Sequence, residues 1–213
     1  MSSFQAQPAQ RPRRILLFVV VAACALAADI ISKCIVVATI SPYDDKRLLG
    51  GALHLVQARN SGAAFSVGTG MTVVLTLIAL AVVVIIVRAA RRLRSVGWAV
   101  SLGLVLGGAL GNLTDRFFRA PGPGKGHVVD WITVFPNSHW TFPTFNLADS
   151  CITIGAVLAV LLSLLNVDLA GSRASSTIGG ADDAERAGDA ERAGDADAAA
   201  GTDGTVTDRY RHG

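Results

Sequence analysis

Four long apolar segments account for most of the first 170 residues. They run over about Ile15–Val37, Met71–Val87, Val96–Leu113 and Ala148–Val167. The hydrocarbon core of a bilayer is roughly 30 Å thick and needs about 20 apolar residues of helix to cross it. The second segment is rich in β-branched residues, which favour a strand in water, but an open strand in lipid would leave its backbone groups unpaired. The pattern therefore predicts an integral membrane protein, mainly α, with four transmembrane helices.

The distribution of arginine predicts which side of the membrane each loop faces. Short loops rich in Lys and Arg stay in the cytoplasm. Basic residues precede the first segment and crowd the link between the second and third: Arg11, Arg13, Arg14, Arg88, Arg91, Arg92 and Arg94. We therefore expect both chain ends inside the cell, with residues 1–14 as a cytoplasmic N-terminus, residues 15–170 as the membrane domain, and outward loops at about 38–70 and 114–147.

The composition changes abruptly at the end of the membrane domain. The whole chain of 213 residues is 51% hydrophobic and only 16% charged, a balance unlike that of soluble proteins. Residues 171–213 instead hold 5 Arg and 9 acidic residues, and they repeat the unit Asp-Ala-Glu-Arg-Ala-Gly from Asp183 and again from Asp189. Such a segment has too few apolar residues to bury a core. We expect a disordered, acidic, cytoplasmic tail.

Glycine and cysteine usage points to packing rather than to a metal. Glycines recur every fourth residue along the third segment, with one more beside them: Gly103, Gly107, Gly108 and Gly111. This spacing predicts a helix face that lets neighbouring helices approach closely. Cys24, Cys34 and Cys151 lack metal-ligand spacing, so we expect small buried residues and no metal site. The first glutamate is Glu185, which excludes an HExxH zinc motif from the membrane domain.

Four aspartates fall near the outward ends of the predicted helices, where charge is costly and often marks function. Asp29 and Lys33 are four residues apart, so they share a helix face and can form an ion pair. Asn112, Asp115 and Arg116 have the spacing to form a hydrogen-bonded cluster at the outer end of the third segment. The guanidinium of Arg116 could also hold a carboxylate or a phosphate.

The other two aspartates are Asp130 and Asp149. Asp130 lies in a short apolar stretch of the second outward loop, and desolvation there should raise its pKa. Asp149 follows Asn146 by three residues at the start of the fourth segment, which resembles a capping box, and a helix N-terminus stabilises a carboxylate. Two acids with opposed preferences for the proton are the parts of a dyad that activates water. The sequence therefore indicates peptide hydrolysis near a membrane surface.

At these residues the chain resembles the lipoprotein signal peptidases (signal peptidase II), membrane-embedded aspartyl proteases of bacteria. The resemblance covers about Asp29–Gly155. It consists of five short elements in the family's order: Asp29 with Ser32–Lys33, Asn60–Phe65 (Asn-Ser-Gly-Ala-Ala-Phe), Gly111–Arg116 (Gly-Asn-Leu-Thr-Asp-Arg), Val128–Trp131 (Val-Val-Asp-Trp) and Phe142–Ser150 (Phe-Pro-Thr-Phe-Asn-Leu-Ala-Asp-Ser).

The resemblance implies roles for these residues. Asp130 and Asp149 match the family's catalytic dyad. Other positions match polar or small residues that line the site or support it: Asn60, Gly62, Asn112, Arg116, Asn146, Asp29 and Lys33. It also implies a small outward β platform, here at about Leu53–Gly68. Two departures are Trp131, where phenylalanine is common, and a long, turn-rich approach to Asp130 over residues 120–126.

The family also implies a substrate and a location. The substrate would be a prolipoprotein whose cysteine carries a diacylglyceryl group, cut just before that cysteine. We expect a multi-pass protein of the bacterial inner membrane with its active site near the outer face, acting as a monomer in contact with lipid. Two carboxylates and water need no metal or organic cofactor, and no nucleic acid is expected as a partner.

The polar residues allow two other interpretations. A small proton-coupled transporter could use Asp29, Lys33, Asp115 and Arg116 as an ion path, but its polar groups should spread through the membrane depth rather than gather at one side. A serine or cysteine peptidase would need a histidine in a partner motif. Three histidines fall in the outward loops and are expected to be solvated or packed: His54, His127 and His139.

A third interpretation concerns the N-terminus. Arginines followed by a short apolar run and Val21–Cys24 resemble the signal peptide of a lipoprotein, with Cys24 as the cleavage cysteine. The apolar residues continue to Val37, as a spanning helix requires and the start of a mature lipoprotein does not. We therefore expect the first segment to remain as a transmembrane helix.

Overall fold

A computed structural model describes residues 12–62, 72–136 and 142–171 of the chain. The predicted N-terminus over 1–14, the platform residues after Gly62, His139 and the predicted tail after Gly171 lie wholly or partly outside these residues. Within them the chain forms four long helices: α1 (Ile15–Thr39), α2 (Thr72–Ala90), α3 (Val96–Phe118) and α4 (Leu147–Leu164).

The four helices coincide with the four predicted segments, and each is long and apolar enough to cross a membrane. The prediction of a multi-pass, mainly α membrane protein is therefore confirmed. The third helix runs five residues beyond the predicted Leu113, to Phe118. Asp115 and Arg116 consequently lie on the last turn of α3 rather than in a loop.

Helix α3 lies at the centre of the bundle and contacts α1, α2 and α4. Its glycines make this possible, because a Cβ atom at Gly107 would lie 2.6 Å from the carbonyl oxygen of Ala22 on α1. A Cβ atom at Gly108 would lie 2.5 Å from the carbonyl oxygen of Ala148 on α4. The predicted packing role of the glycine face is confirmed.

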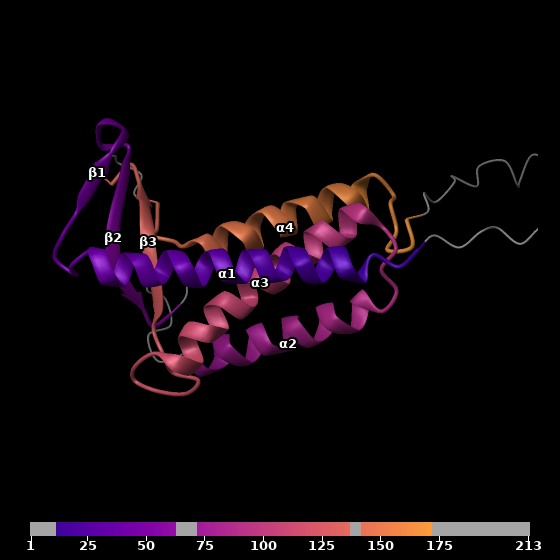
Figure 1. The fold of residues 1–213 in the computed structure, drawn as a ribbon, viewed down its shortest axis with the longest axis horizontal. Coiled ribbons are helices and arrows are strands. Elements are labelled where there is room, and N and C mark those ends of the chain that lie inside the picture. Colours follow the sequence, from indigo (N-terminus) through magenta and orange to yellow (C-terminus); the bar gives the residue numbers. More distant parts are fainter. Residues whose placement is uncertain (1–11, 63–71, 137–141, 172–213) are drawn as a thin grey trace, which may run out of the picture. The chain divides into compact units, whose positions relative to one another are not determined.

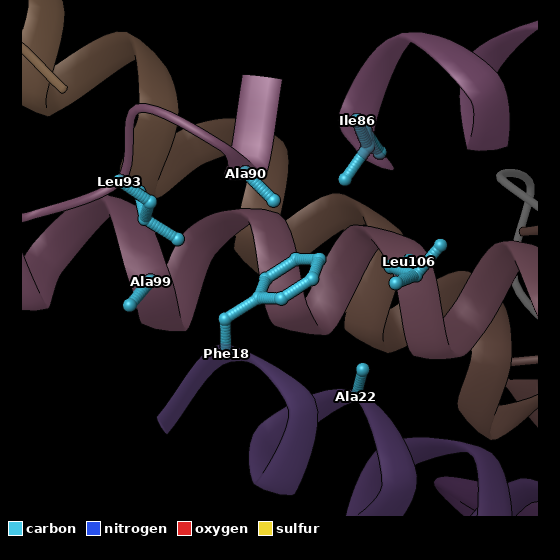
Figure 2. Packing of buried hydrophobic residues seen from close by; sticks show 7 residues of the cluster. All are labelled: Phe18, Ala22, Ile86, Ala90, Leu93, Ala99 and Leu106. Atoms are coloured by element: carbon cyan, nitrogen blue, oxygen red, sulfur yellow. The ribbon is translucent and has the colours of Figure 1, made fainter. Parts of the chain in front are cut away.

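The buried apolar side chains form a small cluster where α1, α2 and α3 meet. Figure 2 shows Phe18 and Ala22 of α1 directed toward α3, with Ile86 and Ala90 of α2 on the other side. Outward side chains of the same helices stay exposed, as expected of surfaces that face lipid. The prediction of buried cysteines is wrong for Cys24 and Cys34, because both lie on this exposed side of α1; Cys151 is partly buried.

A three-stranded antiparallel sheet lies at one end of the helices (Figure 1). Its strands are β1 (Lys46–Leu48), β2 (Leu53–Asn60) and β3 (Val128–Val134), in the order β1-β2-β3, and the one-turn 3-10 helix η1 (Leu49–Gly51) joins the first two. The predicted platform at Leu53–Gly68 is correct for β2 but incomplete. The edge strand β1 precedes β2 in the chain. The other edge strand, β3, comes from the second outward loop and pairs with β2, so that Asp130 lies opposite Ala58.

The helices alternate in direction, so the ends of α1 and α3 and the starts of α2 and α4 lie beside the sheet (Figure 1). The turn-rich segment 120–126 closes onto this end of the bundle. The amide of Gly126 donates to the carbonyl of Arg116 at 3.0 Å, and the Thr76 hydroxyl of α2 donates to the carbonyl of Gly124 at 3.0 Å. The predicted site residues lie at the end of the helix bundle that carries the sheet.

Candidate functional site

Asp130 lies on β3 and is only 3% exposed. Its two carboxylate oxygens accept hydrogen bonds from different elements. Asn146 Nδ2 donates to Oδ1 at 2.7 Å, and Asn60 Nδ2, at the end of β2, donates to Oδ2 at 2.8 Å. The Asn60 side chain is itself oriented, since its Oδ1 accepts from the amide of Gly62 at 2.9 Å. The carboxylate of Asp130 is therefore held in a fixed direction.

Burial raises the pKa of Asp130 from 3.8 to about 6. The largest cause is desolvation, which disfavours the charged carboxylate, and the nearby charge of Asp149 acts in the same direction. The hydrogen bonds from Asn60 and Asn146 and the charge of Lys33 oppose the rise. The expectation of a raised pKa in an apolar setting agrees with this environment.

Asp149 begins α4 and uses its two oxygens for different purposes. Oδ2 accepts from the amide of Asn146 at 3.1 Å, while the amide of Asp149 donates to Asn146 Oδ1 at 2.9 Å. This is the predicted capping box. The second oxygen, Oδ1, accepts from Asn112 Nδ2 at 2.8 Å. Capping therefore occupies one oxygen and leaves the other directed toward α3.

Asn146 connects the two acids. It is completely buried, and its Nδ2 donates both to Asp130 Oδ1 and, at 3.2 Å, to Asn112 Oδ1. Asn112 in turn donates to Asp149. A short chain of amide groups thus runs from one carboxylate to the other, although the residues come from three separate elements.

A buried ionic cluster lies behind the acids. The predicted ion pair is present, with Lys33 Nζ 2.7 Å from Asp29 Oδ2. The same ammonium lies 3.1 Å from Asp115 Oδ2 and donates to Asn112 Oδ1 at 3.0 Å. The predicted cluster at the end of α3 forms in a different way, because Asn112 and Asp115 meet through Lys33 rather than through Arg116. Asp115 also pairs with Arg119.

Arg116 points instead to the cavity that the acids line. It is 8% exposed, and among the described residues its Nε has no hydrogen-bond partner. Its charge interacts with those of Asp149 and Asp130. A positively charged side chain therefore lies at the cavity wall beside both carboxylates.

The cavity has a volume of about 590 Å³. Its polar lining consists chiefly of Asn60, Asn112, Arg116, Asp130 and Asp149, and its apolar lining of Leu75, Val128, Phe142, Phe145 and Ile154. The apolar residues come largely from the starts of α2 and α4 and the segment before α4. The lining can thus accept a chain with apolar substituents and present two carboxyl groups to it. The described residues hold no group of His, Cys, Asp or Glu that could bind a metal ion.

Three predicted site residues lie behind the cavity rather than on its wall: Asp29, Lys33 and Asn146. His54 is buried on the sheet, where its Nδ1 contacts Asp45 and its Nε2 contacts the carbonyl of Gly51 at 3.2 Å. It does not line the cavity, so this histidine offers no partner for a serine nucleophile there. Of the two expected roles, solvated or packed, His54 has the packed one.

The four apolar helices, with a cavity at one end whose wall carries two carboxyl groups, define a multi-pass membrane protein with a site for chemistry. Residues 21–165 match the family model described as Signal peptidase (SPase) II. The chain therefore belongs to the signal peptidase II family, and it is a peptidase.

Relatives and solved structures agree with this family. The chain is 52% identical over 167 residues to the lipoprotein signal peptidase of Rhodococcus jostii, covering 78% of this chain and 81% of that one. It is 48% identical over 157 residues to the lipoprotein signal peptidase of Mycobacterium tuberculosis, covering 74% and 75%. A solved bacterial membrane enzyme, 26% identical, superposes with a TM-score of 0.65 over 74% of this chain and 93% of that chain.

Some contacts around the site cannot be predicted from local patterns in the sequence. The spacing of Asn112, Asp115 and Arg116 indicates a polar cluster, but it does not indicate that Asp115 accepts a hydrogen bond from the amide of Val129, at 3.0 Å. The apolar lining residue Leu75 likewise resembles any other residue of a membrane helix. Such contacts depend on which elements meet, which local patterns do not contain.

Proposed function

We propose that this protein removes signal peptides from prolipoproteins, cutting just before a cysteine that carries a diacylglyceryl group. Membership of the signal peptidase II family supports the substrate class. The observation that carries the reaction type is the cavity into which Asp130 and Asp149 both open, linked by the amides of Asn146 and Asn112. Acids so arranged are suited to aspartyl hydrolysis.

The two acids would share one proton and act on one water molecule. Desolvation favours the neutral form of Asp130, while Asp149 lies at a helix N-terminus, which stabilises negative charge. Asp149 would accept a proton from the attacking water, and Asp130 would donate to the carbonyl oxygen of the scissile bond.

The remaining predicted residues would orient the acids and the substrate. Asn60 and Asn146 each donate to one oxygen of Asp130, which fixes the plane of its carboxyl group. Gly62 keeps Asn60 in place. The guanidinium of Arg116, which lines the cavity, would stabilise the developing negative charge of the substrate. Asp29 and Lys33 would support these groups from behind.

The location of the site fits a substrate anchored in lipid. The wall of the cavity includes Leu75 of α2 and Ile154 of α4, and both helices expose other apolar side chains to their surroundings. Acyl chains could stay among apolar groups while the peptide reaches the acids. Arginines at the far ends of the helices favour a cytoplasmic orientation for that side, which supports a position of the site near the outer face.

The deciding experiment is cleavage of a diacylated prolipoprotein peptide by purified protein. Asp130→Asn and Asp149→Asn should each abolish cleavage, because an amide has nearly the same shape but cannot exchange the proton. Asp44→Asn is the matched control, since Asp44 is exposed and lies outside the cavity lining. Full activity in either site variant would refute the dyad. If an unlipidated peptide were cleaved as fast as the diacylated one, the proposed preference for a lipidated substrate would be refuted.

A further inference from the structure

The two acids have the same kind of support one residue before them. The amide of Val129, which precedes Asp130, donates to Asp115 Oδ2 at 3.0 Å. The amide of Ala148, which precedes Asp149, donates to Asp29 Oδ1 at 2.9 Å. Each acid is therefore attached through its neighbour's backbone to a second carboxylate, which does not line the cavity. These carboxylates belong to different helices, α3 and α1.

One ammonium group joins the two supporting carboxylates. Lys33 Nζ lies 2.7 Å from Asp29 Oδ2 and 3.1 Å from Asp115 Oδ2. The resulting chain of contacts runs from the backbone before Asp149, through Asp29, Lys33 and Asp115, to the backbone before Asp130. It is a second connection between the acids, and it meets the amide chain of Asn146 and Asn112 where Lys33 Nζ donates to Asn112 Oδ1 at 3.0 Å.

The burial of this chain makes it stiff. Asp29 is 0%, Lys33 1% and Asp115 3% exposed, so none of the three can exchange a partner for water. Gly111 of α3 leaves the space that the Asp29 carboxylate occupies, because a Cβ atom at this position would overlap the carboxylate. Removing the charge of Lys33 would leave the buried Asp29 carboxylate without its cationic partner, which is strongly unfavourable.

We infer that Asp29, Lys33 and Asp115 form a clamp that sets the separation between Asp130 and Asp149. This rests on the proposed function, because the clamp matters for turnover only if the two acids act together on one water. The three residues are positioning residues, since none of them lines the cavity. A mutual displacement of reacting groups by about 1 Å can cost about a hundredfold in rate, so the clamp should govern turnover more than substrate binding.

The first test measures cleavage of the diacylated peptide by full-length Asp29→Asn and Asp115→Asn variants. Each amide keeps an oxygen that can accept from Ala148 or Val129 but loses its attraction to Lys33. We expect kcat to fall about tenfold to a hundredfold, with KM within about threefold of the wild type. The double variant should be no worse than the poorer single variant, because either change breaks the same connection.

The second test separates the clamp from an ordinary ion pair. Exchanging the charges within α1, by Asp29→Lys with Lys33→Asp, keeps an i,i+4 pair and the net charge. It also presents an ammonium, which cannot accept a hydrogen bond, to the amide of Ala148. The carboxylate introduced at position 33 would face Asp115, so we expect the melting temperature to recover only in part relative to Lys33→Met, while kcat stays at least about tenfold low. Recovery of kcat together with stability would overturn the clamp.

Ser101→Ala is the matched control. Its hydroxyl is fully buried and donates to the carbonyl of Gly155 at 2.8 Å, joining α3 to α4 without contact to the acids. It should lower the melting temperature and leave kcat unchanged. Normal kcat in Asp29→Asn and Asp115→Asn, or losses that multiply in the double variant, would refute the clamp. If Asp130→Asn is inactive in the same assay, the proposed function stands even when the clamp fails.

Discussion

The buried carboxyl group of Asp130 should make the protein less stable as the pH rises toward neutrality. The pKa of this group is 3.8 in an exposed carboxyl and about 6 in the folded protein. The unfolded chain therefore releases its proton at a lower pH than the folded chain does. Between these two values the folded state binds more protons, so the free energy of unfolding falls as the pH rises and levels off above about 6.

The size of this effect follows from the same two values. One pKa unit corresponds to 1.36 kcal/mol, so the loss amounts to about 3 kcal/mol between pH 3.5 and pH 7. In a domain of this size 1 kcal/mol changes the melting temperature by roughly 2–4 °C. Asp130→Asn has no proton to release and should lack this loss. The other carboxylates are common to both proteins, so most of their contribution cancels in the comparison.

The assay is thermal unfolding of wild type and Asp130→Asn in the same detergent at a series of pH values. The wild type should lose about 6–12 °C relative to the variant between pH 3.5 and pH 7. Any constant cost of the amide, such as an unpaired donor on Asn60 or Asn146, drops out because only the change with pH is used. A difference that stays flat, or that favours the wild type more at neutral pH, would refute the desolvation argument.

Three further outcomes are expected. Gly107→Ala should lower the free energy of unfolding by about 1–3 kcal/mol, because the added methyl group meets the backbone of α1. In the same melting assay Gly97→Ala should cost less, because its methyl group meets only the end of the Leu162 side chain. Asn146→Ser should change the stability that the helix cap contributes by no more than about 0.5 kcal/mol. It should nevertheless lower kcat, because a serine hydroxyl does not replace the amide that connects the two acids. Normal turnover in this variant would contradict that connection. Removing residues 172–213 should leave peptide cleavage nearly unchanged, and a large loss would assign the tail a part in catalysis.

Local patterns were sufficient for the helices and for contacts between neighbours in the chain. Apolar length alone predicts the four spans, because nothing but a helix satisfies its own backbone in lipid. The Asp29–Lys33 pair and the capping box of Asn146 and Asp149 follow from spacings of four and three residues on a helix. These geometries are fixed by the helical repeat whatever the rest of the chain does.

The resemblance to the signal peptidase II family predicts, in addition, that the site residues lie together. The pattern of the residues indicates that Asp130 and Asp149 lie at the same membrane level, but not that they share a cavity, since 18 residues of loop could fold in many ways. The platform shows the limit most clearly. Nothing local in Val128–Val134 specifies that it pairs with β2 rather than with the loop that precedes it.

The amino-acid sequence by itself thus determined the membrane-spanning helices, the close glycine packing and the polar groups at one end. Only the tertiary structure decided which of those groups meet. Asn60 reaches Asp130 across 70 residues of sequence, and Lys33 reaches Asn112 across 79. Such contacts depend on strand register and on the stacking of helices, which are set by the packing of the whole chain and not by the spacing of residues within one element.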